Sequence, residues 1–265
     1  MGRFFDIDSP IMRGLTRLAD VMWLNILTLI FAIPLIFEQF FFLGPAIGPI
    51  MKEGAQFDYS VFLNGLFWAW LFGIICSSIL GPACTAMHYV LLKMVRDEDS
   101  YITKSYFKSF KENFKQGMIL QIIKFITGGV MVLDFFILRT RPGVGILAYV
   151  VVGMAVILYV ASLYVFPILS KFENTTKNII KNSFLMAIIA LPKSIGMAAV
   201  SLLPAMLLYF FDFKVVPILI IIGIAGPSYV NAKLYDATFK RFEPKEEELT
   251  EEEELNNAIK KLDEE

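Results

Sequence analysis

The fold is decided by the stretch Lys93–Lys124, KMVRDEDSYITKSYFKSFKENFKQGMILQIIK, which is the longest polar interval between strongly apolar runs. Its lysines recur at the spacing of an α-helix, and its aromatic residues form a second stripe about a quarter-turn away. The first stripe contains Lys104, Lys108, Lys111 and Lys115, and the second contains Phe107, Phe110, Phe114 and Met118. We predict one amphipathic helix here. Such a helix suits the boundary between lipid and water, or a groove on a partner protein.

The sequence around this stretch is too apolar for a soluble domain. Hydrophobic residues make up 57% of the 265 residues, charged residues make up 18%, and the mean hydropathy is +0.63. Soluble domains carry about 25% charged residues, whereas the apolar runs here reach the roughly 20 residues that cross a bilayer as a helix. We therefore predict an all-α fold, a polytopic transmembrane helix bundle over residues 1–242 with additional cytoplasmic amphipathic helices. About six spans are expected, at 18–42, 61–95, 116–136, 144–169, 184–211 and 215–234.

The second of these runs, 61–95, is too long for one straight span. As a single helix it would extend about 52 Å, against a hydrocarbon core of roughly 30 Å. The run either breaks near Gly81-Pro82 or begins in the membrane interface. Trp68 and Trp70 favour the interfacial start, because tryptophan collects at the depth of the lipid headgroups.

Basic residues are unevenly shared between the connections, which predicts the orientation in the membrane. One set of connections and both ends of the membrane domain hold Arg3, Arg13, Arg17, Lys93, Arg96, the four lysines of the first stripe, Lys171, Lys177, Lys181, Lys233, Lys240 and Arg241. The alternate set holds only Lys52, Arg139, Arg141 and Lys214. With an even number of spans, we expect both termini in the cytoplasm. Residues 243–265 then form an acidic cytoplasmic tail, with eleven acidic residues and three lysines.

A second amphipathic segment precedes the fifth predicted span. Its polar stripe contains Asn174, Lys177, Asn178 and Lys181, while Phe172 lies on another face. Two interpretations apply to both amphipathic segments. They lie at the membrane surface and bind anionic lipid, each lysine contributing about 1 kcal/mol, or they dock on a partner through their aromatic side chains. Docking predicts that Phe110→Asp or Phe114→Asp disrupts assembly more than Lys108→Ala.

Polar residues inside the predicted spans are candidate functional residues, because burying them in lipid is costly. Asn25, Gln121 and Asn231 either hydrogen-bond between helices or line a solute path, and His88 is either a packed side chain or a proton relay. Gly81-Pro82 and Gly226-Pro227 are either broken-helix points beside a substrate site or ordinary helix ends.

The motifs of several enzyme classes are missing from the sequence. A single histidine and two cysteines, Cys76 and Cys84, cannot form the usual His/Cys zinc site. The sequence has neither a Walker A loop nor a G-x-G-x-x-G motif, which excludes an ATPase subunit. We expect no catalytic residues, no metal, no cofactor and no nucleic-acid partner.

Three segments resemble the YesL-like family of bacterial multi-pass membrane proteins, a domain of unknown function. They are Arg3–Asn25, Leu91–Gln116 and Phe166–Ile188. The resemblance covers the chain to about Glu243, but residues 37–79 look like an insertion before the small-residue turn Leu80–Ala83. His88-Tyr89 stands where relatives commonly have two tyrosines. Members of the family are usually encoded beside carbohydrate-uptake ABC transporters, which implies that setting for this chain.

These expectations lead to one main hypothesis and two alternatives. The main hypothesis is a non-catalytic integral membrane accessory subunit of a carbohydrate ABC importer, in the bacterial cytoplasmic membrane. Its partners would be the lipid bilayer and the permease subunits of the importer. The first alternative is an independent small-solute transporter or channel. The second is a membrane-bound sensor or scaffold that uses the acidic tail.

Overall fold

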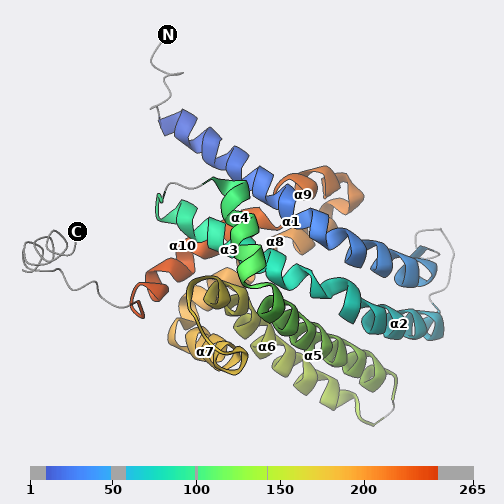
Figure 1. The fold of residues 1–265 in the computed structure, drawn as a ribbon. Coiled ribbons are helices and arrows are strands. Elements are labelled where there is room, and N and C mark those ends of the chain that lie inside the picture. Colours follow the sequence, from blue (N-terminus) through green and yellow to red (C-terminus); the bar gives the residue numbers. More distant parts are fainter. Residues whose placement is uncertain (1–9, 49–57, 99–100, 142, 244–265) are drawn as a thin grey trace, which may run out of the picture.

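The computed structural model describes residues 10–48, 58–98, 101–141 and 143–243, and every regular element in these ranges is a helix (Figure 1). The predicted Arg3, Lys52 and tail beyond Glu243 lie outside the described residues. The all-α membrane fold is confirmed. In the described part of the chain, five segments are long and apolar enough to cross a membrane. They are Ile11–Ile47, Tyr59–Ser78, Phe114–Thr140, Gly145–Lys171 and Leu191–Ile222.

The first two predicted spans form a long hairpin. Helix α1 (Pro10–Ile47) lies beside α2 (Tyr59–Ser78), and α3 (Leu80–Val95) follows α2 after a break at Ile79 (Figure 1). The run 61–95 therefore breaks next to Gly81-Pro82. The interfacial start that Trp68 and Trp70 favoured is not needed, because a break shortens the run into two helices.

Helix α3 lies at the centre of the bundle. It contacts α1, α4 (Ile102–Glu112), α5 (Phe114–Thr140), α6 (Gly145–Lys171) and α10 (Ala225–Phe239). Helices α3 and α5 meet at two glycines, because a Cβ atom at Gly81 would lie 1.9 Å from the carbonyl oxygen of Gly117. Only glycine at this position permits the two backbones to approach so closely, as small residues commonly do between membrane helices.

The predicted helix over the lysine stripe is interrupted. Helix α4 ends at Glu112, and α5 begins at Phe114 after Asn113, whose side chain donates a hydrogen bond of 3.1 Å to the carbonyl oxygen of Ser109. Asparagine competes for backbone groups in this way and therefore favours helix ends. Lys115, Phe114 and Met118 thus belong to α5 and do not continue the stripes of α4.

The last two predicted spans are also divided. The run 184–211 splits at Ala190 into α7 (Thr176–Ile189) and α8 (Leu191–Phe211). Pro192 lies in the first turn of α8, where its missing N–H is not needed. The run 215–234 splits into α9 (Val216–Ile222) and α10, and the short 3₁₀ helix η3 (Asp212–Val215) joins α8 to α9. Neither α9 nor α10 reaches the length of a span alone. The expected six spans are therefore reduced to five, α8, η3 and α9 together making the fifth.

Ion pairs bring four helix ends together at one end of the bundle. Arg17 near the start of α1 pairs with Asp97 after α3. Glu243, just after α10, pairs with Arg96 at the end of α3 and with Lys171 at the end of α6. At the opposite end, the Tyr59 hydroxyl at the start of α2 donates a hydrogen bond of 3.1 Å to the Phe136 carbonyl near the end of α5. The basic residues Arg17, Arg96 and Lys171 of the predicted cytoplasmic set thus lie at the first end.

Candidate functional site

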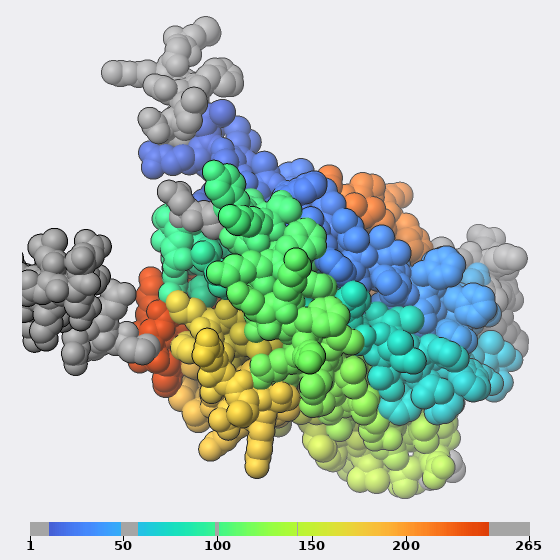
Figure 2. Space-filling model, in the orientation of Figure 1, coloured from blue at the N-terminus to red at the C-terminus, as the bar shows by residue number. Residues whose placement is uncertain are grey.

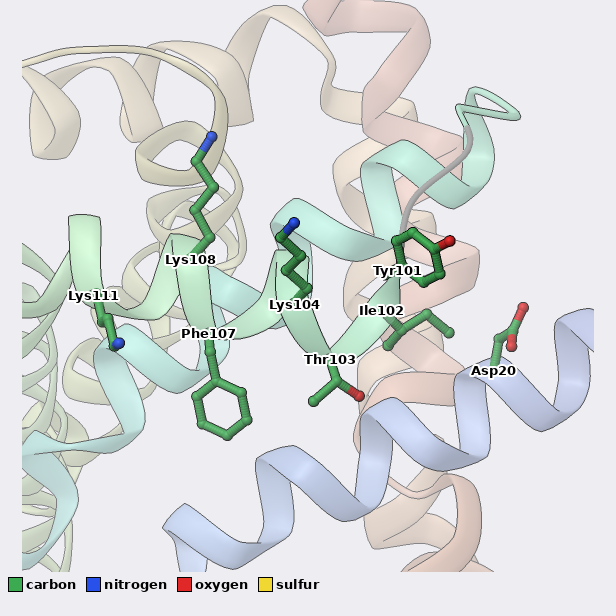
Figure 3. A pocket seen from close by; sticks show the side chains of 8 residues that line it. All are labelled: Asp20, Tyr101, Ile102, Thr103, Lys104, Phe107, Lys108 and Lys111. Carbon is green, nitrogen blue, oxygen red and sulfur yellow. The ribbon is translucent and has the colours of Figure 1, made fainter.

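Helix α4 carries three of the four lysines and two of the three aromatic side chains predicted from the sequence. Lys104, Lys108 and Lys111 are exposed, and the first two project away from α1 in Figure 3. Phe107 extends from the other side of the helix, and Tyr101 is exposed just before α4. A hollow of about 850 Å³ lies between α4 and Asp20 of α1 and is lined by these side chains.

The aromatic stripe divides into an inward and an outward part. Phe110 packs against Phe31 of α1, with ring centroids 4.7 Å apart, and the neighbouring Tyr106 is completely buried. Phe107 and Phe114 remain 39% and 37% exposed. Phe110 therefore helps to hold α4 on the bundle, and its docking role stays a prediction. Tyr106 was missed, although its position one residue before Phe107 places it on the side opposite the lysines.

Polar contacts also attach α4 and the segment before it to α1. The indole nitrogen of Trp23 donates a hydrogen bond of 2.9 Å to the Thr103 hydroxyl. The guanidinium of Arg17 pairs with the carboxylate of Asp97. Burial of the Tyr106 phenol raises its pKa above the ordinary value. One side of α4 is thus fixed, and its other side is free to contact lipid or protein.

The second amphipathic segment lies next to the first. The side-chain amide of Gln116, near the start of α5, donates a hydrogen bond of 2.7 Å to the Asn174 carbonyl just before α7. In Figure 2 the green atoms of α4 and early α5 lie beside the yellow atoms of α7. Six lysines are exposed on α4, at the start of α5 and on α7: Lys104, Lys108, Lys111, Lys115, Lys177 and Lys181. We call these six residues the basic face.

Only part of the second predicted stripe contributes to the basic face. Lys177, Asn178 and Lys181 are exposed on α7, and Thr175 caps the helix by accepting a hydrogen bond from the Asn178 backbone. Asn174 precedes the helix and is half-buried. Phe172 packs on Phe239 of α10, with ring centroids 5.2 Å apart, so it is a packing residue and not part of the exposed surface.

Asn25 bridges the break between α9 and α10. Its amide nitrogen donates a hydrogen bond of 2.7 Å to the Ile220 carbonyl, and its amide oxygen accepts bonds of 2.8 Å from the backbone N–H groups of Ile224 and Ala225. One side chain thus satisfies groups at the end of one helix and the start of the next, which have no partner within their own helix. This confirms hydrogen bonding between helices as a role of Asn25.

The other predicted intramembrane polar residues are also packed. The Asn231 amide donates a hydrogen bond of 2.8 Å to the Ser201 hydroxyl of α8. The imidazole nitrogen Nδ1 of the buried His88 lies 3.3 Å from the Tyr235 hydroxyl of α10. Gln121 is buried on α5 against the contact between Gly81 and Gly117. These three side chains lie at helix contacts, which agrees with the packing interpretation of the sequence.

Arg96 is the residue whose role the sequence did not reveal. It lies directly after α3, where its side chain is only 11% exposed, and it binds Asp236 at 2.7 Å and both carboxylate oxygens of Glu243 at 2.6 and 3.0 Å. These bonds raise the pKa of Arg96. The pKa of Glu243 is lowered, chiefly by its hydrogen bonds from Arg96. Asp236 was the hint in the sequence, because it is an acidic residue close to the end of the apolar run 215–234. Its partner Arg96 could not be inferred, because it is 140 residues away in the chain.

Comparison with known proteins matches part of the chain to a family. Residues 60–135 match a family described as a protein of unknown function, DUF624. Searches of curated proteins and of solved structures find no match. The matched range contains α3, α4 and most of α2 and α5. The sequence had suggested that residues 37–79 are an insertion. Residues 60–79 instead lie inside the matched segment. The segment 60–135, which includes α4, is thus similar to the DUF624 family, in agreement with the resemblance seen in its sequence.

Proposed function

We propose that the chain is a non-catalytic accessory subunit of a carbohydrate ABC importer in the bacterial cytoplasmic membrane, and that it binds the permease through the outward surface of α4. The observation that carries this proposal is the division of α4 into two sides. Phe110 and Tyr106 pack against the bundle on one side, while Phe107 of α4 and Phe114 at the start of α5 remain partly exposed and the lysines of α4 are exposed. An exposed aromatic surface rimmed by charge is typical of protein interfaces.

The arrangement of charges supports a cytoplasmic position for this surface. The start of α1, the link from α3 to α4, the end of α6 and the end of α10 are joined by ion pairs, and all of them carry basic residues. Basic connections of membrane proteins face the cytoplasm. Because α9 and α10 return the chain toward this end of the bundle, both ends of the membrane domain lie on the cytoplasmic side in our proposal, despite the odd number of long spans.

The alternative of a small-solute transporter or channel has less support. It required a polar path lined by Asn25, Gln121 or Asn231. Asn25 binds the backbone of α9 and α10, and the amide nitrogen of Asn231 donates to Ser201, so both side chains join helices. The break near Gly81-Pro82 is covered by the packing of α3 on α5 at Gly117. At the break before Gly226-Pro227, Asn25 binds the backbone N–H groups of Ile224 and Ala225. We therefore favour the accessory role.

Purification from the native membrane with the importer present tests the proposal. The full-length chain is expected to co-purify with the permease, and Phe107→Asp is expected to lose it without lowering the thermal unfolding midpoint. Lys108→Ala, which changes an exposed lysine on the same helix, is the matched control and should retain the permease.

Phe110→Asp separates docking from folding. Because Phe110 packs against Phe31, this variant should unfold at a lower temperature, whether or not a partner is present. A chain that purifies without the permease, or a Phe107→Asp variant that still binds it, would overturn the docking proposal. Unchanged sugar uptake after deletion of the chain would overturn the accessory role.

A further inference from the structure

A long apolar groove follows the outer surface of the bundle, away from α4. It lies between α5 and α6, and α7 and α8 complete its wall. Its volume is about 620 Å³. Along α5 the groove extends from Leu120 to Phe135. A helix rises about 1.5 Å per residue, so this part of the groove is roughly 22 Å long. The groove is therefore elongated along the helices and lies on the part of the bundle that faces lipid.

One cation stands near one end of the groove. Lys124 lines it, and the lysine ammonium lies 5.2 Å from the centre of the Phe166 ring of α6. None of the ion pairs formed among the described residues includes Lys124. A lysine within a span is costly unless it is paired or reaches the membrane surface, and the ring of Phe166 supplies only part of a counter-charge.

The rest of the groove is apolar and open. The side chains of Ile180 and Phe184 of α7 lie at the lysine end, and Met131 and Phe135 of α5 line the far part. Gly128 forms part of the floor, and a Cβ atom there would have no neighbour within 4 Å. The groove thus combines a single positive charge at one end with a narrow apolar channel along most of its length.

We propose that this groove is a binding site for an anionic phospholipid, with the phosphate of the headgroup at Lys124 and one acyl chain along α5 and α6. A soluble anion would leave the apolar length unused, and a zwitterionic lipid would bring its own cation close to Lys124. Basic pockets between membrane helices on the cytoplasmic side commonly bind anionic headgroups. The lysine end is the end of α5 nearest the basic face, so the lipid comes from the same leaflet that the basic face contacts.

The test uses the purified full-length chain and two photoactivatable lipids that differ only in the headgroup. One is a phosphatidylglycerol and the other a phosphatidylcholine, each with a diazirine on one acyl chain. Cross-linked peptides are mapped by mass spectrometry. Phosphatidylglycerol should label residues 127–135 and 151–159 about fivefold more than phosphatidylcholine, the ratio that corresponds to about 1 kcal/mol for one lysine.

Three variants locate the effect. Lys124→Gln should abolish the preference for phosphatidylglycerol, and Gly128→Phe should reduce labelling by both lipids because it fills the groove. Gly153→Phe places the same side chain on an exposed glycine of α6 outside the groove, where a Cβ atom also meets nothing within 4 Å, and should behave like the wild type. Replacing Lys104, Lys108 and Lys111 of the basic face by Gln should leave the groove labelling unchanged.

Competition on the wild-type chain repeats the test without any variant. Unlabelled phosphatidylglycerol should displace the photoactivatable lipid about fivefold more effectively than unlabelled phosphatidylcholine. Equal labelling or equal competition by the two lipids would overturn the proposal. So would a Lys124→Gln variant that keeps the preference, or a Gly128→Phe variant that is labelled like Gly153→Phe.

Discussion

Helices α2 and α3 come from one apolar run of sequence, yet they have opposite surroundings. Eleven of the sixteen residues of α3 are buried, against three of the twenty residues of α2. Helix α3 is enclosed by five other helices, whereas α2 packs mainly on α1 and α5 and exposes large side chains such as Phe72 and Ile75. Lipid is therefore the solvent for most of α2, and protein is the solvent for α3.

The difference is visible in both the size and the polarity of the side chains. Helix α3 begins Leu80-Gly81-Pro82-Ala83 and continues with small or polar residues such as Thr85 and His88, which permit close helix contacts. Helix α2 contains phenylalanine, tryptophan and leucine at many positions. In a membrane, apolar side chains are equally at home against lipid or protein, so small residues mark the buried helix.

The largest expected effect concerns the ends of the two helices. Arg96→Gln at the end of α3 leaves the buried carboxylate of Asp236 without its main partner, and breaking a buried ion pair costs about 3–5 kcal/mol. Asp58→Ala at the start of α2 removes a helix cap that accepts bonds from the backbone of Ser60 and Val61. This loss should be much smaller, because the cap is exposed. Thermal unfolding in detergent, followed by circular dichroism, measures both. Equal losses would contradict the contrast.

A pair of aliphatic truncations should follow in size. Leu91 of α3 is completely buried, and Leu91→Ala should cost about 2–5 kcal/mol because it leaves a cavity. Ile75 of α2 is 72% exposed. Ile75→Ala should therefore change the free energy of unfolding by only about 0.5 kcal/mol or less. The same unfolding assay in one detergent compares the two. A large loss for Ile75→Ala would show that α2 is covered by protein.

Adding a methyl group to a glycine tests how closely each helix is packed. Gly81→Ala in α3 meets the backbone of Gly117 and should cost about 1–3 kcal/mol. Gly73→Ala in α2 meets chiefly the far end of the Phe125 ring, which can move, so a smaller loss is expected. The unfolding midpoints of the two variants give the order. The contrast fails if Gly73→Ala is the more destabilised.

The smallest expected effect is a dependence on acid. Arg96 lowers the pKa of Glu243 in the folded chain below the ordinary value of 4.5. The ion pair therefore contributes its full stability above that ordinary pKa and loses it as the pH falls through the lower folded value. Wild-type stability should decrease between neutral pH and the acid range, and Glu243→Gln should show a shallower decrease. Unfolding midpoints at several pH values measure the slope. Identical slopes would remove this role of Glu243.

Local pattern predicted the elements that depend on length and apolar content. The spans at 116–136 and 144–169 correspond to α5 and α6 within a few residues, and the break near Gly81-Pro82 is present. The interruptions at Asn113 and Ala190 were missed, because the helical period continues through both in the sequence. The inward position of Phe110 could not be inferred either. It depends on Phe31, a residue of a different helix, and the sequence does not say which face of an amphipathic helix meets the protein.

The bridge made by Asn25 ties the order of synthesis to the order of folding. Asn25 lies in α1, while the backbone groups that it binds at Ile224 and Ala225 are made 199 and 200 residues later. Until those residues are made, the side-chain amide of Asn25 lacks these hydrogen-bond partners. The backbone N–H groups of Ile224 and Ala225, between α9 and α10, likewise lack this acceptor unless α1 is already in place. This contact between α1 and the start of α10 can thus form only after about 200 further residues have been made.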